Sequence, residues 1–93
     1  MSLGLAISKV AEYTEKHASL LEEVANQERI VESLLDKKGA AADDPNFRQA
    51  QKELIRLKTL AGLVKQFLEF WQDVIKQFME LLKKANELAF GAR

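Results

Sequence analysis

Residues 50–89 read AQKELIRLKTLAGLVKQFLEFWQDVIKQFMELLKKANELA, and this stretch decides the fold. Its apolar residues recur at alternating spacings of four and three: Ala50, Leu54, Leu57, Ala61, Val64, Leu68, Trp71, Ile75, Phe78, Leu82, Ala85 and Ala89. Such a stripe is the a/d seam of a long helix that packs against other helices. The seam carries no nucleophile, base or metal ligand, so it predicts an architecture and no reaction.

A second, less regular helical pattern covers residues 3–38. We expect its seam to place the following apolar side chains inward: Ile7, Val10, Leu21, Val24, Val31 and Leu35. The same seam includes the polar residues Thr14, His17 and Glu28. Leu20, Ile30 and Leu34 widen the apolar face on one side, which is typical of a helix with more than one neighbour.

The two patterns meet at residues 39–45. Gly39 can end the first helix in a left-handed conformation, and Asp44 can cap the second, in which Pro45 takes the first position. Short connections usually fold sequential helices back on each other. We therefore predict an all-α, antiparallel two-helix hairpin that forms one domain over residues 1–93, with helices at about 3–38 and 45–90, and that assembles into a four-helix bundle. The alternatives are a continuous rod through residues 40–42 and an exchange of helices between chains.

Composition limits the classes of function. The 93 residues carry 14 basic and 14 acidic side chains, so no net charge draws the chain to nucleic acid or to an anionic membrane. The lack of cysteine excludes disulfides, thiolate metal sites and cysteine catalysis. We expect no signal peptide and no transmembrane segment, because charged residues interrupt the most apolar stretch, residues 60–82. These features favour a soluble, cytoplasmic protein.

The second helix carries more apolar surface than one neighbour can cover. Besides the seam, an apolar column repeats every seven residues at Leu60, Phe67, Val74, Leu81 and Leu88. Five such side chains left in water would forgo on the order of 10 kcal/mol. With the residues beside it, this column predicts an interface formed by Leu60, Leu63, Phe67, Phe70, Trp71, Val74, Leu81 and Leu88.

No pattern in the chain indicates catalysis or a bound cofactor. His17 is the only histidine, no Glu-x-x-His motif occurs, and the glycines are not grouped as in a phosphate loop. We therefore expect no enzyme activity, no cofactor, no metal and no small-molecule substrate. His17 is expected to be structural.

These observations predict a non-enzymatic interaction or assembly module that pairs with itself, as a dimer, or with another helical protein. One alternative is a membrane-active subunit of a pore-forming or secretion assembly, whose aromatic residues meet lipid. Another is nucleic-acid binding through basic residues in the range 48–65, namely Arg48, Lys52, Arg56, Lys58 and Lys65.

The joint resembles that of type III secretion needle subunits. The resemblance covers Asp44-Pro45 and the start of the amphipathic helix that follows, with Gln49, Gln51, Leu54 and Leu57. It implies a helical hairpin that assembles with other copies. The apolar seam is heavier here than in such subunits, and no family is assigned.

Overall fold

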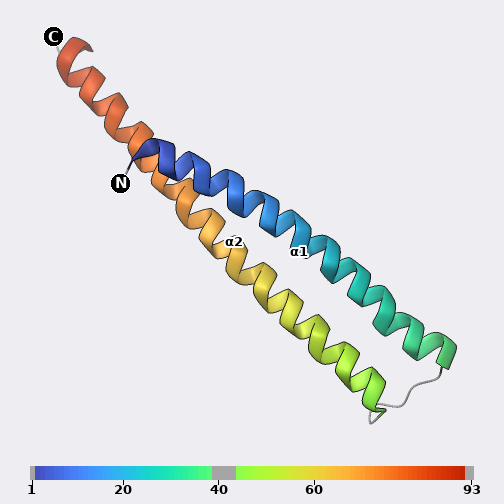
Figure 1. The fold of residues 1–93 in the computed structure, drawn as a ribbon. Coiled ribbons are helices and arrows are strands. Elements are labelled where there is room, and N and C mark those ends of the chain that lie inside the picture. The colour runs from blue at the N-terminus through green and yellow to red at the C-terminus, as the bar shows by residue number, and fades with distance from the viewer. Residues whose placement is uncertain (1, 39–43, 92–93) are drawn as a thin grey trace.

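Two long helices lie side by side in the computed structural model, which describes residues 2–38 and 44–91 (Figure 1). Helix α1 spans Leu3–Lys38 and helix α2 spans Pro45–Asn86, after which a π-helical turn, η1, covers Glu87–Gly91. The helices run antiparallel, and the predicted hairpin is confirmed. Gly39 and residues 40–42, on which the predicted helix end and the shape of the joint depend, lie outside the described residues.

Both helices begin with a side-chain cap. Asp44 Oδ1 accepts hydrogen bonds from the backbone N–H groups of Asn46 (2.8 Å) and Phe47 (3.2 Å), and Pro45 follows at the first helical position, as predicted. At α1, Ser2 Oγ accepts a bond from the N–H of Leu5 at 3.1 Å. This use of Ser2 was not predicted. Each cap satisfies amides that have no partner within the helix.

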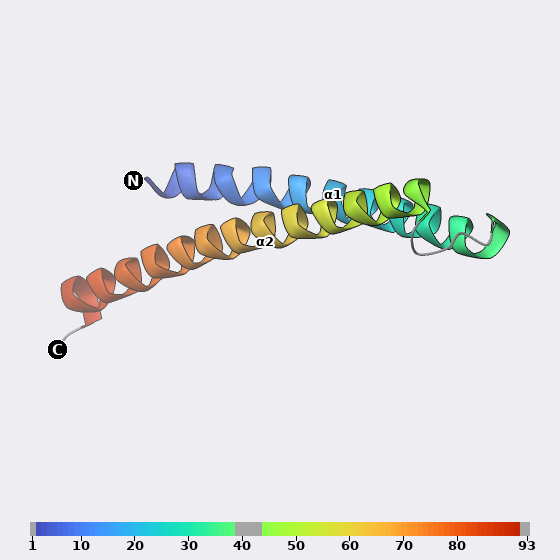
Figure 2. The ribbon, with the colours of Figure 1, turned by 90° about the horizontal axis from the view of Figure 1, so that it is seen from below.

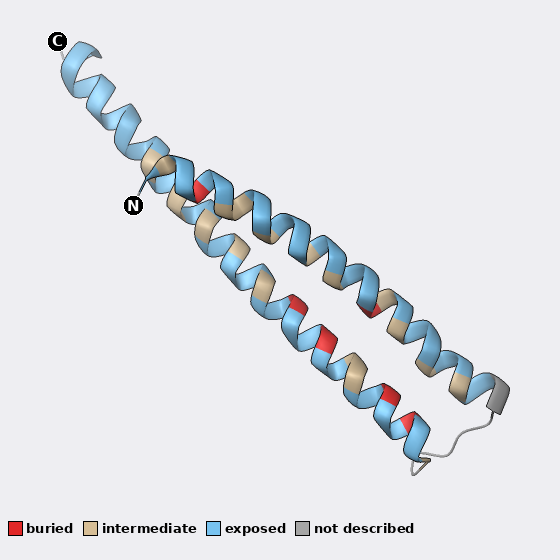
Figure 3. Ribbon diagram, viewed as in Figure 1, coloured by how far each residue is buried: buried red, intermediate tan, exposed pale blue. Residues whose placement is uncertain are grey.

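The core is the contact between the facing sides of the two helices (Figure 3). Its buried residues are Ala6, Val24, Phe47, Ala50, Leu57 and Ala61. The rest of the predicted α2 seam from Leu54 to Phe78 is partly buried, so the seam is confirmed over this range. No side chain with a large volume is completely buried among the described residues, because a hairpin covers each helix on one side only.

The predicted seam of α1 is wrong in one of its two columns. Ile7, Leu21 and Leu35 are 54%, 49% and 46% exposed, and Thr14 and Glu28 are exposed as well. The inward column consists instead of the residues one position earlier, which are Ala6, Tyr13, Leu20, Gln27 and Leu34. The other predicted column, formed by Val10, His17, Val24 and Val31, is buried or partly buried as expected.

A polar residue explains this choice. The predicted column would have turned the Glu28 carboxylate inward, where burial of a charge without a partner is costly. The observed column turns Gln27 inward, and its Nε2 donates a hydrogen bond to the backbone carbonyl of Ala50 at 3.0 Å. Burying a neutral amide that finds an acceptor costs less, and the bond helps to fix how the helices align.

The helices differ in length, and α2 continues past the end of α1 (Figures 1 and 2). Every described residue from Met79 to Gly91 is exposed, including the seam residues Leu82, Ala85 and Ala89. We call residues 79–91 the overhang. The seam pattern therefore continues for about three turns beyond the helix that covers it.

The molecule is long and thin as a result. It measures 74 × 20 × 16 Å, and its radius of gyration is 21.4 Å, against about 12 Å for a compact domain of this length. None of the helices described over residues 2–38 and 44–91 has an apolar stretch long enough to cross a membrane.

Candidate protein–protein interface

Most of the predicted interface residues lie together along one flank of the α2 seam. We call this set the aromatic strip; it consists of Leu60, Leu63, Phe67, Phe70, Trp71 and Val74. Leu63, Phe67 and Phe70 are 46%, 53% and 52% exposed. Leu60 is 36% exposed, whereas Val74 and Trp71 are partly buried because they stand closer to α1. The hairpin thus leaves the outer part of the strip uncovered.

Aromatic contacts hold the strip in place. The ring of Phe67 stacks on Tyr13 of α1 with centroids 5.7 Å apart and planes inclined by 23°. Phe70 meets Trp71 edge to face at 5.2 Å and 78°. Lys16 Nζ lies 5.5 Å from the centroid of Tyr13, on the α1 side of the same cluster. Stacked and edge-to-face arrangements are the favoured geometries of aromatic pairs, so these contacts stabilise the ring positions of Phe67 and Phe70.

The strip is hollowed along its length. One shallow pocket is lined by Tyr13, Gln66, Phe67, Phe70 and Trp71, and a second by Phe70, Val74, Gln77, Phe78 and Leu81. Phe70 belongs to both pockets, so the two hollows are neighbours along α2. Two heptad columns lie beside the seam on this flank: Leu60, Phe67, Val74 and Leu81 form one, and Leu63, Phe70 and Gln77 form the other. Neither column carries a charge, and Gln77 is their single polar residue. Over the 22 positions from Leu60 to Leu81 the helix advances about 32 Å.

Charged residues stand at the edges of the strip. Toward the joint, Arg56 Nε donates to Glu53 Oε2 at 3.0 Å, and this hydrogen bond lowers the pKa of Glu53 and raises the pKa of Arg56. On α1, Glu12 Oε2 accepts from Lys9 Nζ at 3.2 Å, and that bond, with the charges of Lys9 and Lys16, lowers the pKa of Glu12. The strip therefore has an apolar centre and a charged rim, as protein interfaces commonly do.

The opposite flank of α2 is different in character. Its heptad positions hold Gln51, Lys58, Lys65 and Gln72. A shallow pocket on this flank is lined by His17, Leu21, Val24, Lys58, Ala61, Gly62 and Lys65. A hairpin that needed no partner would have polar residues on both flanks. Only one flank of α2 is polar, which marks the aromatic strip as the unusual surface.

The basic residues proposed for nucleic-acid binding do not form one cluster. Lys58 and Lys65 line the polar flank beside His17, whereas Arg56 is paired with Glu53 near the aromatic strip. Arg48 and Lys52 are exposed on the outer side of α2. His17 is partly buried at the seam and lines a shallow pocket together with Lys58 and Lys65.

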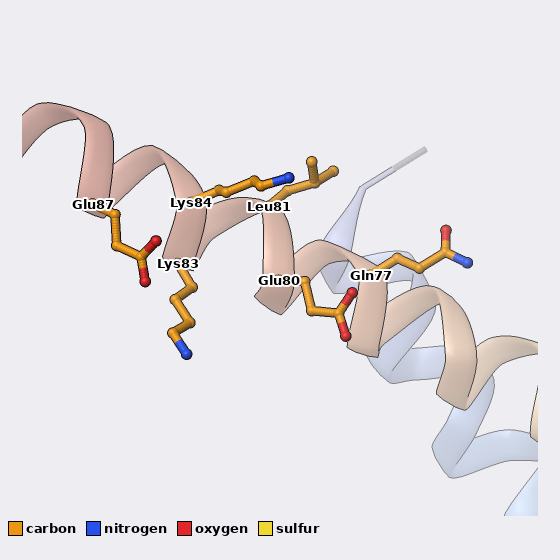
Figure 4. Close-up of a pocket in the computed structure, with 6 residues that line it drawn as sticks. All are labelled: Gln77, Glu80, Leu81, Lys83, Lys84 and Glu87. Atoms are coloured by element: carbon orange, nitrogen blue, oxygen red, sulfur yellow. The ribbon is translucent and has the colours of Figure 1, made fainter. Parts of the chain in front are cut away.

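Two of the predicted interface residues lie outside the strip. Leu81 and Leu88 are 65% and 77% exposed and belong to the overhang. The hollow at this point is lined by Gln77, Glu80, Leu81, Lys83, Lys84 and Glu87, all from α2 and η1 (Figure 4). Since one helical stretch alone supplies these residues, the hollow has no opposite wall and is an uncovered helix surface.

Comparisons of the chain with known protein families, with curated proteins and with solved structures found no match. Over residues 2–38 and 44–91, no three His, Asp or Glu side chains are grouped so as to hold a metal ion. The sequence prediction missed Tyr13 of α1, whose ring stacks on Phe67 of the strip. The signal for it was the column Ala6, Tyr13, Leu20, Gln27 and Leu34, which the stronger apolar character of the neighbouring column obscured.

Proposed function

We propose that the protein is a non-enzymatic assembly module whose aromatic strip docks on a second copy of the chain, so that two hairpins form a four-helix bundle. The observation that carries this proposal is the uncharged, hollowed and exposed strip on one flank of a hairpin whose other flank is polar. Two-fold pairing is the commonest arrangement of soluble homo-oligomers, and it lets one strip cover another.

The surface area of the chain supports association. The accessible surface is 7152 Å², whereas a compact monomer of 10.5 kDa exposes about 5,400 Å². The excess of about 1,750 Å² on one chain is about twice the roughly 800 Å² that each partner buries in a standard stable interface. A hairpin of this shape therefore has enough uncovered surface for a stable dimer.

The test is the mass and the length of the protein in solution, measured by light scattering and small-angle X-ray scattering over a range of concentrations. The natural chain is expected to form a compact side-by-side dimer as its concentration rises, and Phe67→Glu with Phe70→Glu is expected to lose that compact dimer. The matched control is Ile55→Glu with Gln72→Glu, which adds the same charge to α2 away from the strip and should leave the dimer intact. A natural chain that is a folded monomer at every concentration would overturn the proposal.

A second variant guards against a loss of folding. Leu63→Glu with Phe70→Glu leaves the stack of Phe67 on Tyr13 in place, so its circular dichroism should match that of the natural chain while the compact side-by-side dimer is lost. Co-flotation with phospholipid vesicles, abolished by the same variant, would instead assign the strip to lipid and favour a membrane-active subunit. Retention on DNA or RNA at low salt, removed by changing Lys58 and Lys65, would favour the nucleic-acid alternative.

A further inference from the structure

The overhang is a second uncovered surface, separate from the aromatic strip. Its seam residues Leu82 and Ala85 continue the stripe by which α2 packs on α1, but α1 ends before it reaches them. Leu82 is 51% exposed, and Leu81 and Leu88 beside it are 65% and 77% exposed. The exposed seam of the overhang therefore has the same apolar character as the part of the α2 seam that packs against α1.

The charged side chains of the overhang lie away from its apolar seam. Glu80, Lys83, Lys84 and Glu87 occupy heptad positions on the side away from Leu82 and Ala85. Figure 4 shows these four side chains around the last turns of α2, with no second helix facing them. An apolar seam with its charges on the far side is the pattern of a helix that packs against another helix.

We propose that the overhangs of two copies pair antiparallel, seam to seam, and join two hairpins end to end. An antiparallel pair related by a two-fold axis between residues 83 and 84 sets Leu82 of one copy against Ala85 of the other, and the reverse. A large side chain then faces a small one in both layers, which allows close packing without a cavity. Leu81 and Leu88 of the two copies flank these layers on one side.

The occupant is a second copy because the surface is self-complementary and because it continues the seam by which α2 packs on α1. The partner's overhang runs in the direction of α1 and meets the seam of α2 where α1 leaves it. The contact continues an interface that already exists within each chain. This pairing uses different residues from the aromatic strip and does not depend on it. A chain that used both two-fold surfaces would build an extended assembly.

The length of the dimer in solution shows which of the two surfaces forms it. Each hairpin is 74 Å long, so an end-to-end dimer that overlaps by about 12 residues is about 130 Å long. A side-by-side bundle through the aromatic strip stays near the length of one hairpin. Small-angle X-ray scattering on Leu63→Glu with Phe70→Glu, whose strip is disrupted, is expected to show the long dimer. A monomer at all concentrations, or a dimer of unchanged length, would overturn the inference.

Substitutions in the overhang test the seam itself. Leu82→Lys places a charge on the seam and should abolish the long dimer, whereas Glu80→Gln makes the same change in net charge on the outer side and should not. Because the chain has no cysteine, Leu82→Cys and Ala85→Cys chains can be mixed and oxidised. Antiparallel pairing predicts that in an equal mixture the mixed disulfide exceeds each homodimer by clearly more than the roughly twofold ratio that random pairing gives. An excess of the two homodimers would overturn the antiparallel arrangement.

Discussion

The same apolar seam has two environments along α2. Between Pro45 and Phe78 it lies against α1, and Leu57 is only 6% exposed. In the overhang the spacing and the residue types continue, but Leu82 is 51% exposed. A heptad stripe therefore indicates only that a helix has an apolar surface to bury. It does not show which helix buries that surface or where the cover ends.

The paired part and the overhang should respond differently to the same substitution. Leu57→Ala removes a buried side chain and is expected to lower the free energy of unfolding by about 2 to 5 kcal/mol. Leu82→Ala removes a half-exposed one and should cost about 1 kcal/mol or less in the monomer. Urea denaturation at a concentration where the protein is monomeric measures both.

The protein concentration should affect the two substitutions differently. If overhangs pair between copies, the cost of Leu82→Ala should rise with protein concentration, because the dimer is linked to folding. The cost of Leu57→Ala should not change in this way. Equal losses for the two variants in the monomer would contradict the difference in burial on which the comparison rests.

The sequence predicted the features that depend on one helix at a time. Asp44-Pro45 marked the start of α2 because a cap and a first-position proline act locally. The α2 seam was clear because its two columns are apolar throughout. In α1 the choice lay between two mixed columns, one with Thr14 and Glu28 and the other with Gln27. Hydrophobicity alone favoured the wrong one, since the acceptor for Gln27 is a carbonyl of the other helix.

The candidate site was predicted in the same partial way. The column from Leu60 to Leu88 reads as one continuous surface, because its spacing does not change. The structure divides that column into a strip beside α1 and an overhang beyond it. This division depends on how the two helices align, and the Tyr13–Phe67 and Gln27–Ala50 contacts show that alignment. The sequence pattern of one helix does not predict how it aligns with the other.

The cap at the start of the paired part should have an intermediate effect. Asp44→Ala leaves the first amides of α2 without an acceptor and is expected to lower the free energy of unfolding by about 1 kcal/mol. Asp44→Asn keeps a capping oxygen and should restore most of the loss. Thermal and urea denaturation measure both variants. Equal losses for alanine and asparagine would mean that the charge of Asp44, and not its hydrogen bonds to Asn46 and Phe47, stabilises the helix.

Acid should produce the smallest difference between the two regions. Glu53 and Glu12 have pKa values lowered from 4.5 by hydrogen bonds from Arg56 and Lys9 beside the paired seam. A carboxyl whose pKa is lower in the folded chain stabilises it fully above the unfolded pKa, and this contribution is lost as the pH falls through the folded pKa. Stability should therefore fall slightly as the pH drops below 4.5, and only slightly, because both carboxylates are exposed.

Two double variants show whether the loss of stability in acid comes from the paired part or from the overhang. Glu12→Gln with Glu53→Gln should flatten the decline in acid, since the amides cannot lose a charge. Glu80→Gln with Glu87→Gln, in the overhang, should leave the decline as it is, because neither carboxylate has an ion-pair partner among the described residues. Urea denaturation from about pH 6 to about pH 3 compares the two pairs. A larger effect from the overhang pair would mean that Glu80 and Glu87 form ion pairs in solution, either with Lys83 and Lys84 of the same helix or with a second chain.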